Sequence, residues 1–429
     1  MGTESWQLLV WVCRRWRSLV FESPRRLDLR LVCTPQTPVK KTLGVWPAFP
    51  LIIEGGITRS SDEDNVNAAL KLSNRVSQVD LVNLERWQLE RIFAVMQVSF
   101  PQLTDLRLIR GGGFAIPIPE LFLGGSAPSL RHFALSGIPF PGLPKLLLSS
   151  NRLVSLWLTK IPHSVFISPE ALVALLSVLS SLETLSLGFE SSIFHSAWQS
   201  RSPAELSILP ALKKFHFKGV TEYSEDLFTH IDTPQLYKMH LKFFNQIHFN
   251  CPRLTRFIDR TPTLRPFDEA LVLFDGGHAC IRLGYRTFHS GINDFRIDIL
   301  CGGLGSDRQL SSIEQLWNSF LPPLCTVEDL YIEYASQLVW RCDAIGNTLW
   351  LQLLLPFTTV KNIYISRTFA PGIAAALREL VGARITEVLP SLQHIFVEGL
   401  KESGPVPDDI GQFVAARQLS GHTIAISDR

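Results

Sequence analysis

Few residues of this 429-residue chain stand at spacings that catalysis or cofactor binding would require. Gly302-Gly303-Leu304-Gly305 lies between an expected strand and an expected helix, as a dinucleotide-binding loop would. The third glycine of that motif would fall where the chain has Arg308, so a plain loop is favoured. The sequence contains no P-loop, GxSxG, HExxH or EF-hand pattern. We therefore predict no catalytic residues and no cofactor, and we do not expect an enzyme.

The cysteines and histidines lack the paired spacing of a metal site. The chain has seven cysteines, which are scattered and never spaced CxxC. His278 and Cys280 lie beside an expected tight turn, where a surface histidine is the simpler interpretation. We predict no metal site. Buried, unpaired cysteines are typical of a reducing compartment, so a cytoplasmic or nuclear location is expected.

The composition excludes several classes of protein. Hydrophobic residues make up 46% of the chain and charged residues 19%, which excludes intrinsic disorder. The net charge is +2, so no overall field directs the chain to nucleic acid or to a membrane surface. There is no apolar run of about 18 residues that could form a transmembrane helix. The expected partner is therefore another protein, not a nucleic acid or a membrane.

Aromatic and basic residues recur at alternate positions within short apolar runs and are candidates for binding that partner. These residues are Trp157, Lys214, His216, Lys218, Lys238, His240, Lys242, Tyr331 and Tyr364. Residues two apart in a strand share a face, so these side chains would project from the face opposite the core. Aromatic and basic groups together are typical of binding hot spots, although an ordinary solvated sheet face is the alternative. The lysines predict a partner that presents acidic residues.

The runs that would position these side chains follow the pattern L-x-x-L-x-L, as in residues 103–108, 153–158 and 182–187. Variants recur about every 28 residues, near the period of leucine-rich repeats. Between the runs the apolar spacing becomes helical, as in residues 89–96. We predict an α/β leucine-rich-repeat-like solenoid with a parallel sheet and outer helices. The core positions expected to be buried are Leu106, Leu156, Leu185, Leu330 and Ile363.

Three regions are expected along the chain. Residues 1–23 should form a helical segment, residues 24–400 the solenoid, and residues 401–429 a C-terminal tail. Residues 270–286 are typical of an antiparallel hairpin that interrupts or decorates the solenoid, with Asp275-Gly276-Gly277 at its turn.

The N-terminal segment has an apolar face. Leu9, Cys13, Trp16 and Val20 are spaced for one side of a helix, and an arginine cluster falls partly opposite. We expect this face, with Trp6, to dock on the first strands as a cap and to leave the arginines in water.

The sequence Val-Cys-Arg-Arg-Trp-Arg-Ser-Leu-Val at residues 12–20, with Ser-Pro-Arg-Arg-Leu at 23–27, resembles the C-terminal half of an F-box. The chain looks like fungal, basidiomycete-type F-box proteins with degenerate leucine-rich repeats, and the likeness continues at Trp46-Pro47 and residues 411–417. In that family the F-box binds a Skp-type adaptor of a cullin-based SCF ubiquitin ligase. The resemblance implies adaptor binding by Val12, Cys13, Trp16 and Leu19. The earlier half of the F-box has no counterpart in the sequence.

The resemblance implies a substrate-recognition subunit of an SCF-type ubiquitin ligase, with the repeats holding the substrate. The alternative is a leucine-rich-repeat interaction scaffold that has no ubiquitin role and uses the N-terminal helix as a cap. A docked cap would hide the face that an adaptor needs, so we expect weak adaptor binding or none. The sequence does not identify the substrate or the oligomeric state.

Overall fold

The computed structural model divides the chain into two compact units, Met1–Trp198 and Gln199–Arg429. Several sequence features lie outside the described residues, namely Trp6, Leu9, residues 23–27, the hairpin turn at 276–277 and the loop at 302–305. The structure describes residues 10–22, 29–113, 116–141, 143–162, 167–191, 206–244, 249, 251–264, 267–275, 278–284, 294–301, 306–319, 324–335, 346–380, 382–400 and 406–428.

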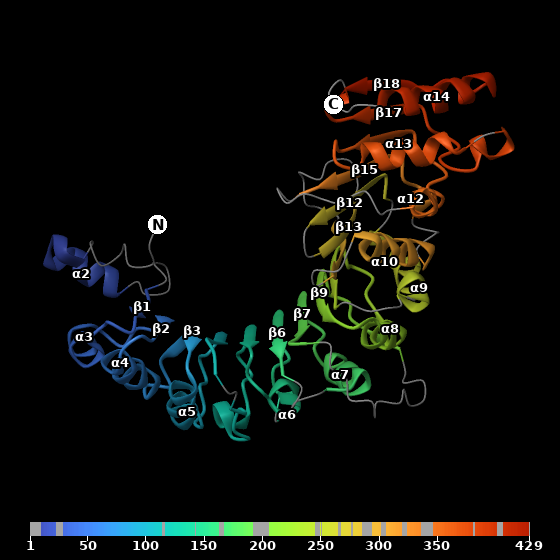
Figure 1. Cartoon of the computed structure of the whole chain (residues 1–429). Helices are drawn as coiled ribbons and strands as arrows, with labels where there is room; N and C mark the ends of the chain where they lie inside the picture. The colour runs from blue at the N-terminus through green and yellow to red at the C-terminus, as the bar shows by residue number, and fades with distance from the viewer. Residues whose placement is uncertain are drawn as a thin grey trace. The chain divides into compact units, whose positions relative to one another are not determined.

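In the first unit, strands and helices alternate, and the helices lie on one face of the strands (Figure 1). The strands β1 to β7 are parallel to their neighbours and follow chain order in the sheet. The elements are α2 (Arg14–Phe21), β1 (Leu31–Cys33), α3 (Val39–Val45), β2 (Leu51–Gly56), α4 (Ser60–Leu70), β3 (Val76–Leu84), α5 (Arg86–Val95), β4 (Asp105–Arg110), η1 (Phe122–Gly125), β5 (His132–Ser136), α6 (Leu143–Leu148), β6 (Ser155–Ile161), α7 (Pro169–Leu176) and β7 (Thr184–Phe189).

In the second unit, the order of strands in the main sheet is β9-β11-β14-β13-β12-β15-β16-β17-β18, and β8 pairs with β10. The helices again lie on one face of the strands (Figure 1). The elements are β8 (Ser207–Ile208), β9 (Lys214–Gly219), α8 (Thr221–His230), β10 (Ile231–Asp232), β11 (Lys238–Phe243), α9 (Pro252–Arg260), η3 (Pro262–Leu264), β12 (Glu269–Asp275), β13 (His278–Gly284), β14 (Asp294–Leu300), α10 (Ser306–Ser319), β15 (Asp329–Tyr334), α12 (Asn347–Leu354), β16 (Asn362–Ile365), α13 (Ala370–Arg378), η4 (Gly382–Thr386), β17 (His394–Val397), α14 (Val406–Leu419) and β18 (Ala425–Asp428).

The alternation of side chains in the strands explains the core. Leu106 is 1% exposed, and Leu156, Leu185, Leu330 and Ile363 are fully buried, as predicted from the period of two. The helix α7 begins where the sequence provides a cap: Ser168 Oγ accepts a hydrogen bond from the backbone N–H of Ala171 at 3.2 Å. The leucine-rich-repeat-like α/β architecture with a parallel sheet and outer helices is therefore confirmed. Within the described residues, no helix is both long and apolar enough to cross a membrane.

The hairpin is built into the sheet. β12 and β13 are antiparallel, and β13 is also antiparallel to β14. β14 lies parallel to β11, and β12 lies parallel to β15. These three strands therefore enter the sheet in reverse chain order, with β13 as the strand that runs against its neighbours. This reversal brings β14 beside β11, an adjacency that the repeat spacing does not reveal.

Repeat structure also continues beyond residue 400, where a tail was expected. The helix α14 buries Ile410 and Phe413, and β18 pairs in parallel with β17. Arg417 on α14 is buried and donates from Nη2 to the carbonyl oxygens of Val388 at 2.6 Å and Leu389 at 3.0 Å. These carbonyls follow η4, and the Leu389 carbonyl also accepts from the backbone N–H of Leu392 at 3.1 Å, so Arg417 joins α14 to the preceding repeat.

The N-terminal helix differs from the predicted cap. Cys13 and Trp16 are exposed, whereas Val10 and Val20 are buried. Phe21 packs against Phe49 with a centroid distance of 5.6 Å. The physical reason is the extended backbone of Cys13 (φ −163°, ψ 171°), which separates the helical residues 10–12 from α2. Because the helix is interrupted there, the spacing does not relate the residues before the break to α2. Within α2, Val20 near the C-terminal end is buried, whereas Trp16, one turn earlier, is 47% exposed.

Candidate functional site

One continuous row of side chains crosses the strands of the second unit on the face away from the helices, which we call the strand face. Each member lies opposite the next in the strand register. The row is His216, His240, Arg296, Arg282, Leu271, Tyr331, Tyr364 and Phe396. It contains four of the residues predicted to bind a partner. It also contains Arg296 and Arg282, which the sequence analysis missed because the reversed strand order decides their place.

The basic end of this row is flanked by lysines. Lys214 lies opposite Lys238, and Lys218 lies opposite Lys242, one residue pair on each side of the histidines. The His216 and His240 rings meet edge-on with centroids 5.8 Å apart. We define the basic patch as Lys214, His216, Lys218, Lys238, His240, Lys242 and Arg296.

Asp298 is a buried residue that contacts two side chains of the basic patch. Its side chain is only 3% exposed. His240 Nε2 lies 2.5 Å from Asp298 Oδ2, and Arg296 donates to Oδ1 from Nη2 at 2.9 Å. Burial alone would raise the pKa of the Asp298 carboxyl, but the hydrogen bonds from His240 and Arg296 outweigh burial and hold that pKa below its usual range. Asp298 therefore stays ionised and fixes the orientation of both side chains.

The pKa of His216 is lowered by burial and by the positive charges around it. Burial, followed by the charges of His240, Lys238 and Lys214, lowers the pKa of His216 to about 4. His216 is therefore neutral near pH 7. Asp294 balances part of the charge, because it accepts from Arg282 Nε at 2.9 Å and lies 3.6 Å from Lys238 Nζ. The lysines of the patch outnumber the carboxylates beside them, so this region of the strand face remains positive.

The other end of the row is a stack of aromatic rings. Tyr331 and Tyr364 have centroids 4.3 Å apart at an interplanar angle of 6°, and Tyr364 and Phe396 are 4.6 Å apart at 7°. This spacing is close to the distance between strands, so each ring covers the face of the next. The exposed parts are therefore ring edges and hydroxyl groups, which suit contact with a polypeptide better than stacking of nucleotide bases.

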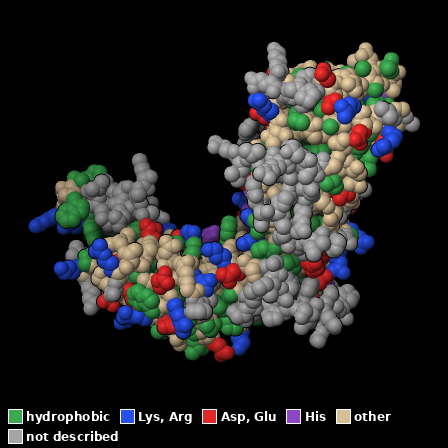
Figure 2. Space-filling view, in the orientation of Figure 1, with side chains coloured by type: hydrophobic (Ala, Val, Ile, Leu, Met, Phe, Trp, Pro, Cys, Tyr) green, Lys and Arg blue, Asp and Glu red, His purple; other side chains and the backbone are tan. Residues whose placement is uncertain are grey.

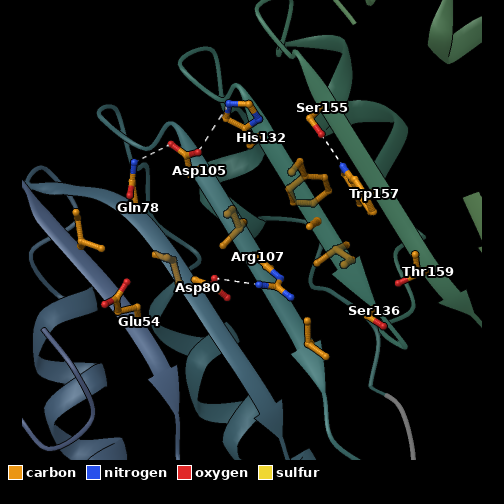
Figure 3. A pocket seen from close by; sticks show the side chains of 17 residues that line it. Glu54, Gln78, Asp80, Asp105, Arg107, His132, Ser136, Ser155, Trp157 and Thr159 are labelled. Carbon is orange, nitrogen blue, oxygen red and sulfur yellow. Dashed lines mark hydrogen bonds and ion pairs between the residues drawn. The ribbon is translucent and has the colours of Figure 1, made fainter. Parts of the chain in front are cut away.

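Trp157 lies elsewhere, in the first unit, where it lines a pocket of about 550 Å³ (Figure 3). Trp157 was predicted to bind a partner together with the lysines, but Trp157 and the lysines belong to different units. The pocket is lined by Ile52, Glu54, Gln78, Val79, Asp80, Asp105, Leu106, Arg107, Ile109, His132, Phe133, Ala134, Leu135, Ser136, Ser155, Trp157 and Thr159.

The residues that the F-box resemblance singles out lie on the surface. Hydrophobic side chains gather over α2 in Figure 2. Val12 is 63% exposed, Trp16 47% and Leu19 56%, and Cys13 is also exposed. Trp11, at 72%, extends this apolar surface. The expectation that a docked cap hides these residues is therefore wrong.

Metal binding and a reactive cysteine are two kinds of chemistry on which the described residues bear. No group of three or more His, Cys, Asp or Glu side chains among them could hold a metal ion. Cys280 lies beside Asp298, but burial, followed by the charge of Asp298, raises the pKa of its thiol to about 12. A protonated, buried thiol is a poor nucleophile.

No protein-family model and no curated protein sequence matches the chain. Among solved structures, the chain is similar to the leucine-rich repeat-containing protein LegL7 from Legionella pneumophila, at 13% identity and a TM-score of 0.31, over 92% of this chain and 98% of that one. It is also similar to a chain of the TLR13-ssRNA13 complex, at 11% identity and a TM-score of 0.32, over 85% of this chain and 45% of that one. At these TM-scores the class rests on the chain's own geometry, which is that of a leucine-rich-repeat-like protein.

Proposed function

We propose that the chain is an interaction scaffold that binds a polypeptide across the strand face of its second unit. The observation that carries this proposal is the continuous row from His216 to Phe396, which joins the basic patch to the aromatic stack. Aromatic and cationic side chains are enriched among the residues that contribute most to binding energy.

The charge of the row indicates the kind of partner. The lysines of the basic patch favour a segment that carries Asp or Glu, because opposite charges steer association and fix its register. The aromatic stack provides apolar ring edges next to hydroxyl groups, which favours neighbouring apolar side chains in the same segment. The partner is therefore expected to be a polypeptide with acidic residues followed or preceded by apolar ones.

The test begins with selection of binding peptides from a random displayed library on the full chain. The selected peptides are then synthesised and titrated by fluorescence anisotropy. Reversal of Lys214, Lys238 and Lys242 to Glu should weaken binding by about a hundredfold, and Tyr364→Ala by about tenfold. The matched control reverses three exposed charges outside the row, Lys71, Lys145 and Arg152, and should leave affinity unchanged.

The result would contradict the proposal if the selected peptides lack acidic residues, or if the control triple variant weakens binding as much as the patch triple variant does. A salt titration adds a second readout. Affinity through the basic patch should fall steadily as ionic strength rises, since exposed charges are screened.

A second candidate function is F-box-like adaptor binding, and the exposure of Val12, Trp16 and Leu19 is the observation that favours it. The interaction scaffold without a ubiquitin role remains the main proposal, because it depends only on the strand face. A pull-down of purified Skp-type adaptor with the full chain separates the two. Stoichiometric capture that Trp16→Glu abolishes would support the adaptor role, and absence of capture at about 10 μM adaptor would count against it.

A further inference from the structure

We infer that the pocket on the strand face of the first unit, centred on Ala134, binds a cationic side chain of an extended peptide, an arginine or a lysine. This site is separate from the proposed function, because all of its lining residues belong to the first unit. Its success or failure in a binding test is therefore independent of the basic patch.

The pocket exists because of one small side chain. Arg107, Ala134 and Trp157 lie opposite one another on β4, β5 and β6. Arg107 and Trp157 both project outward, with 53% of the Arg107 side chain and 41% of Trp157 exposed. Ala134 contributes a single methyl group between them, so the two larger side chains become the walls of a hollow (Figure 3). The volume of about 550 Å³ is in the range of ligand sites.

The charge of the lining favours a cation. Glu54, Asp80 and Asp105 contribute three carboxylates, against the guanidinium of Arg107 and the imidazole of His132. Arg107 Nη1 is already 3.2 Å from Asp80 Oδ2, so its charge is balanced within the pocket. Oδ1 of Asp80 is enclosed and accepts no hydrogen bond from the described residues, so the ion pair satisfies only one of its oxygens.

Asp105 is held in place by two neutral donors. It accepts from Thr104 Oγ1 at 2.6 Å. It also accepts from Gln78 Nε2 at 3.2 Å, and His132 Nε2 lies 4.0 Å from its Oδ1 (Figure 3). Neutral donors orient a carboxylate without cancelling its charge, so Asp105 adds to the negative potential of the pocket. Glu54, at the other end of the lining, is exposed and adds to it as well.

Trp157 supplies the second requirement of a site for a cationic side chain. Its Nε1 donates to Ser155 Oγ at 2.6 Å, which fixes the plane of the indole on the sheet (Figure 3). A fixed, exposed indole attracts a guanidinium or ammonium group through the cation–π interaction. An arginine side chain could therefore stack on Trp157 while its charge faces Asp105. Asp80 and Glu54 lie farther along the same row, beyond Arg107, and add to the negative potential from a greater distance.

The experiment uses the full chain and three short probes: N-acetyl-Gly-Arg-Gly-amide, the same peptide with citrulline, and the same peptide with glutamate. Citrulline keeps the shape of arginine and removes its charge. Binding is followed through the NMR signal of the Trp157 indole N–H, which the Trp157→Phe variant identifies. We expect a saturable shift with the arginine probe in the range of about 1–10 mM, and at least about tenfold weaker binding of the citrulline probe.

Two variants locate the binding. Ala134→Leu fills the hollow and should abolish the shift, whereas Ala134→Ser keeps it open and should leave the shift in place. Glu54→Gln with Asp105→Asn should weaken the arginine probe by about tenfold while leaving the citrulline probe unchanged.

Three outcomes would overturn the inference: no saturable shift up to about 10 mM probe, equal binding of the arginine and citrulline probes, or unchanged binding in Ala134→Leu. The lysine version of the probe distinguishes the cation itself from guanidinium stacking. If lysine binds as well as arginine, charge rather than planarity selects the ligand, and the inference stands in both cases.

Discussion

The strand faces of the two units use the same framework for opposite chemistry. In the first unit, Asp80 and Asp105 stand on the surface, with 44% and 35% of their side chains exposed. In the second unit, Asp298 is buried beneath His240 and Arg296, and the surface above it is basic. Exposed carboxylates remain hydrated and leave a negative pocket. The buried carboxylate of Asp298 instead orients the side chains of His240 and Arg296. Repeats of one architecture therefore do not imply one kind of partner.

The difference in burial also separates function from stability. An exposed pair such as Arg107–Asp80 contributes little to the free energy of unfolding, because water stabilises the separated charges almost as well as the ion pair does. Asp298 is 3% exposed and contacts both His240 and Arg296, so its loss removes the one buried carboxylate that both side chains share. Substitution of the exposed carboxylates in the pocket of the first unit should therefore cost less stability than substitution of the buried Asp298 in the second unit.

The largest expected effect tests the alternation that both faces share. Leu156→Asp and Leu330→Asp each place an unpaired carboxylate in a core, since both side chains are fully buried. Each should lower the free energy of unfolding by more than about 4 kcal/mol. The neighbouring changes Trp157→Asp and Tyr331→Asp, on the strand faces, should cost about 1 kcal/mol. Urea denaturation followed by circular dichroism measures all four. Equal costs within a pair would show that the two neighbours do not face opposite sides.

A smaller effect distinguishes the two kinds of carboxylate. Asp298→Asn should lower the free energy of unfolding by about 3 kcal/mol at pH 7, because Arg296 and His240 lose their buried counter-charge. Asp80→Asn, which opens an exposed pair, should cost less than about 1 kcal/mol. Urea denaturation of both variants provides the comparison. A loss of the same size in both would contradict the assignment of Asp298 as a buried anchor.

The pH dependence of this second effect follows from the direction of the pKa shift. The pKa of Asp298 is lowered in the folded chain, so the ionised form is favoured by folding. Its contribution is complete above the unfolded pKa of about 3.9 and is lost as the pH falls further. The difference in stability between the natural chain and Asp298→Asn should therefore narrow below about pH 4.

The smallest expected effect concerns His216. Its pKa of about 4 is below the unfolded value of about 6.5, so the unfolded chain binds the proton first as the pH falls. The free energy of unfolding should fall by about 2 kcal/mol between pH 6.5 and pH 4, and His216→Asn should remove this part of the slope. NMR titration gives the pKa directly. Lys214→Met with Lys238→Met should raise it, whereas the control Lys71→Met should leave it unchanged.

A His216 that titrates near its ordinary value in the natural chain would show that neither burial nor the charges of the basic patch act on it as inferred. The first unit offers the contrast, since its pocket combines carboxylates with a single arginine. The two strand faces would then be distinguished by their shape and not by their electrostatic potential.

The sequence alone determined the parts of this protein that depend on local spacing. The L-x-x-L-x-L pattern identifies the strands and the buried residues, because alternate side chains of a strand must point to opposite faces. The same alternation is enough to place His216 with His240 and Tyr331 with Tyr364 in one column, and the strand register pairs them so. The hollow at Ala134 was also within reach, since a small residue falls between Arg107 and Trp157 in one column.

Tertiary structure decided the features that depend on contacts between distant segments. The reversed order of β12, β13 and β14 brings Arg296 and Asp298 to His240, although 58 residues separate His240 from Asp298. The extended backbone at Cys13 breaks the apolar face that the helical spacing predicted. Strand order and backbone breaks depend on which pairings bury the most surface and satisfy the most hydrogen bonds across the whole fold. The periodicity within one segment cannot predict them, because it reflects only that segment.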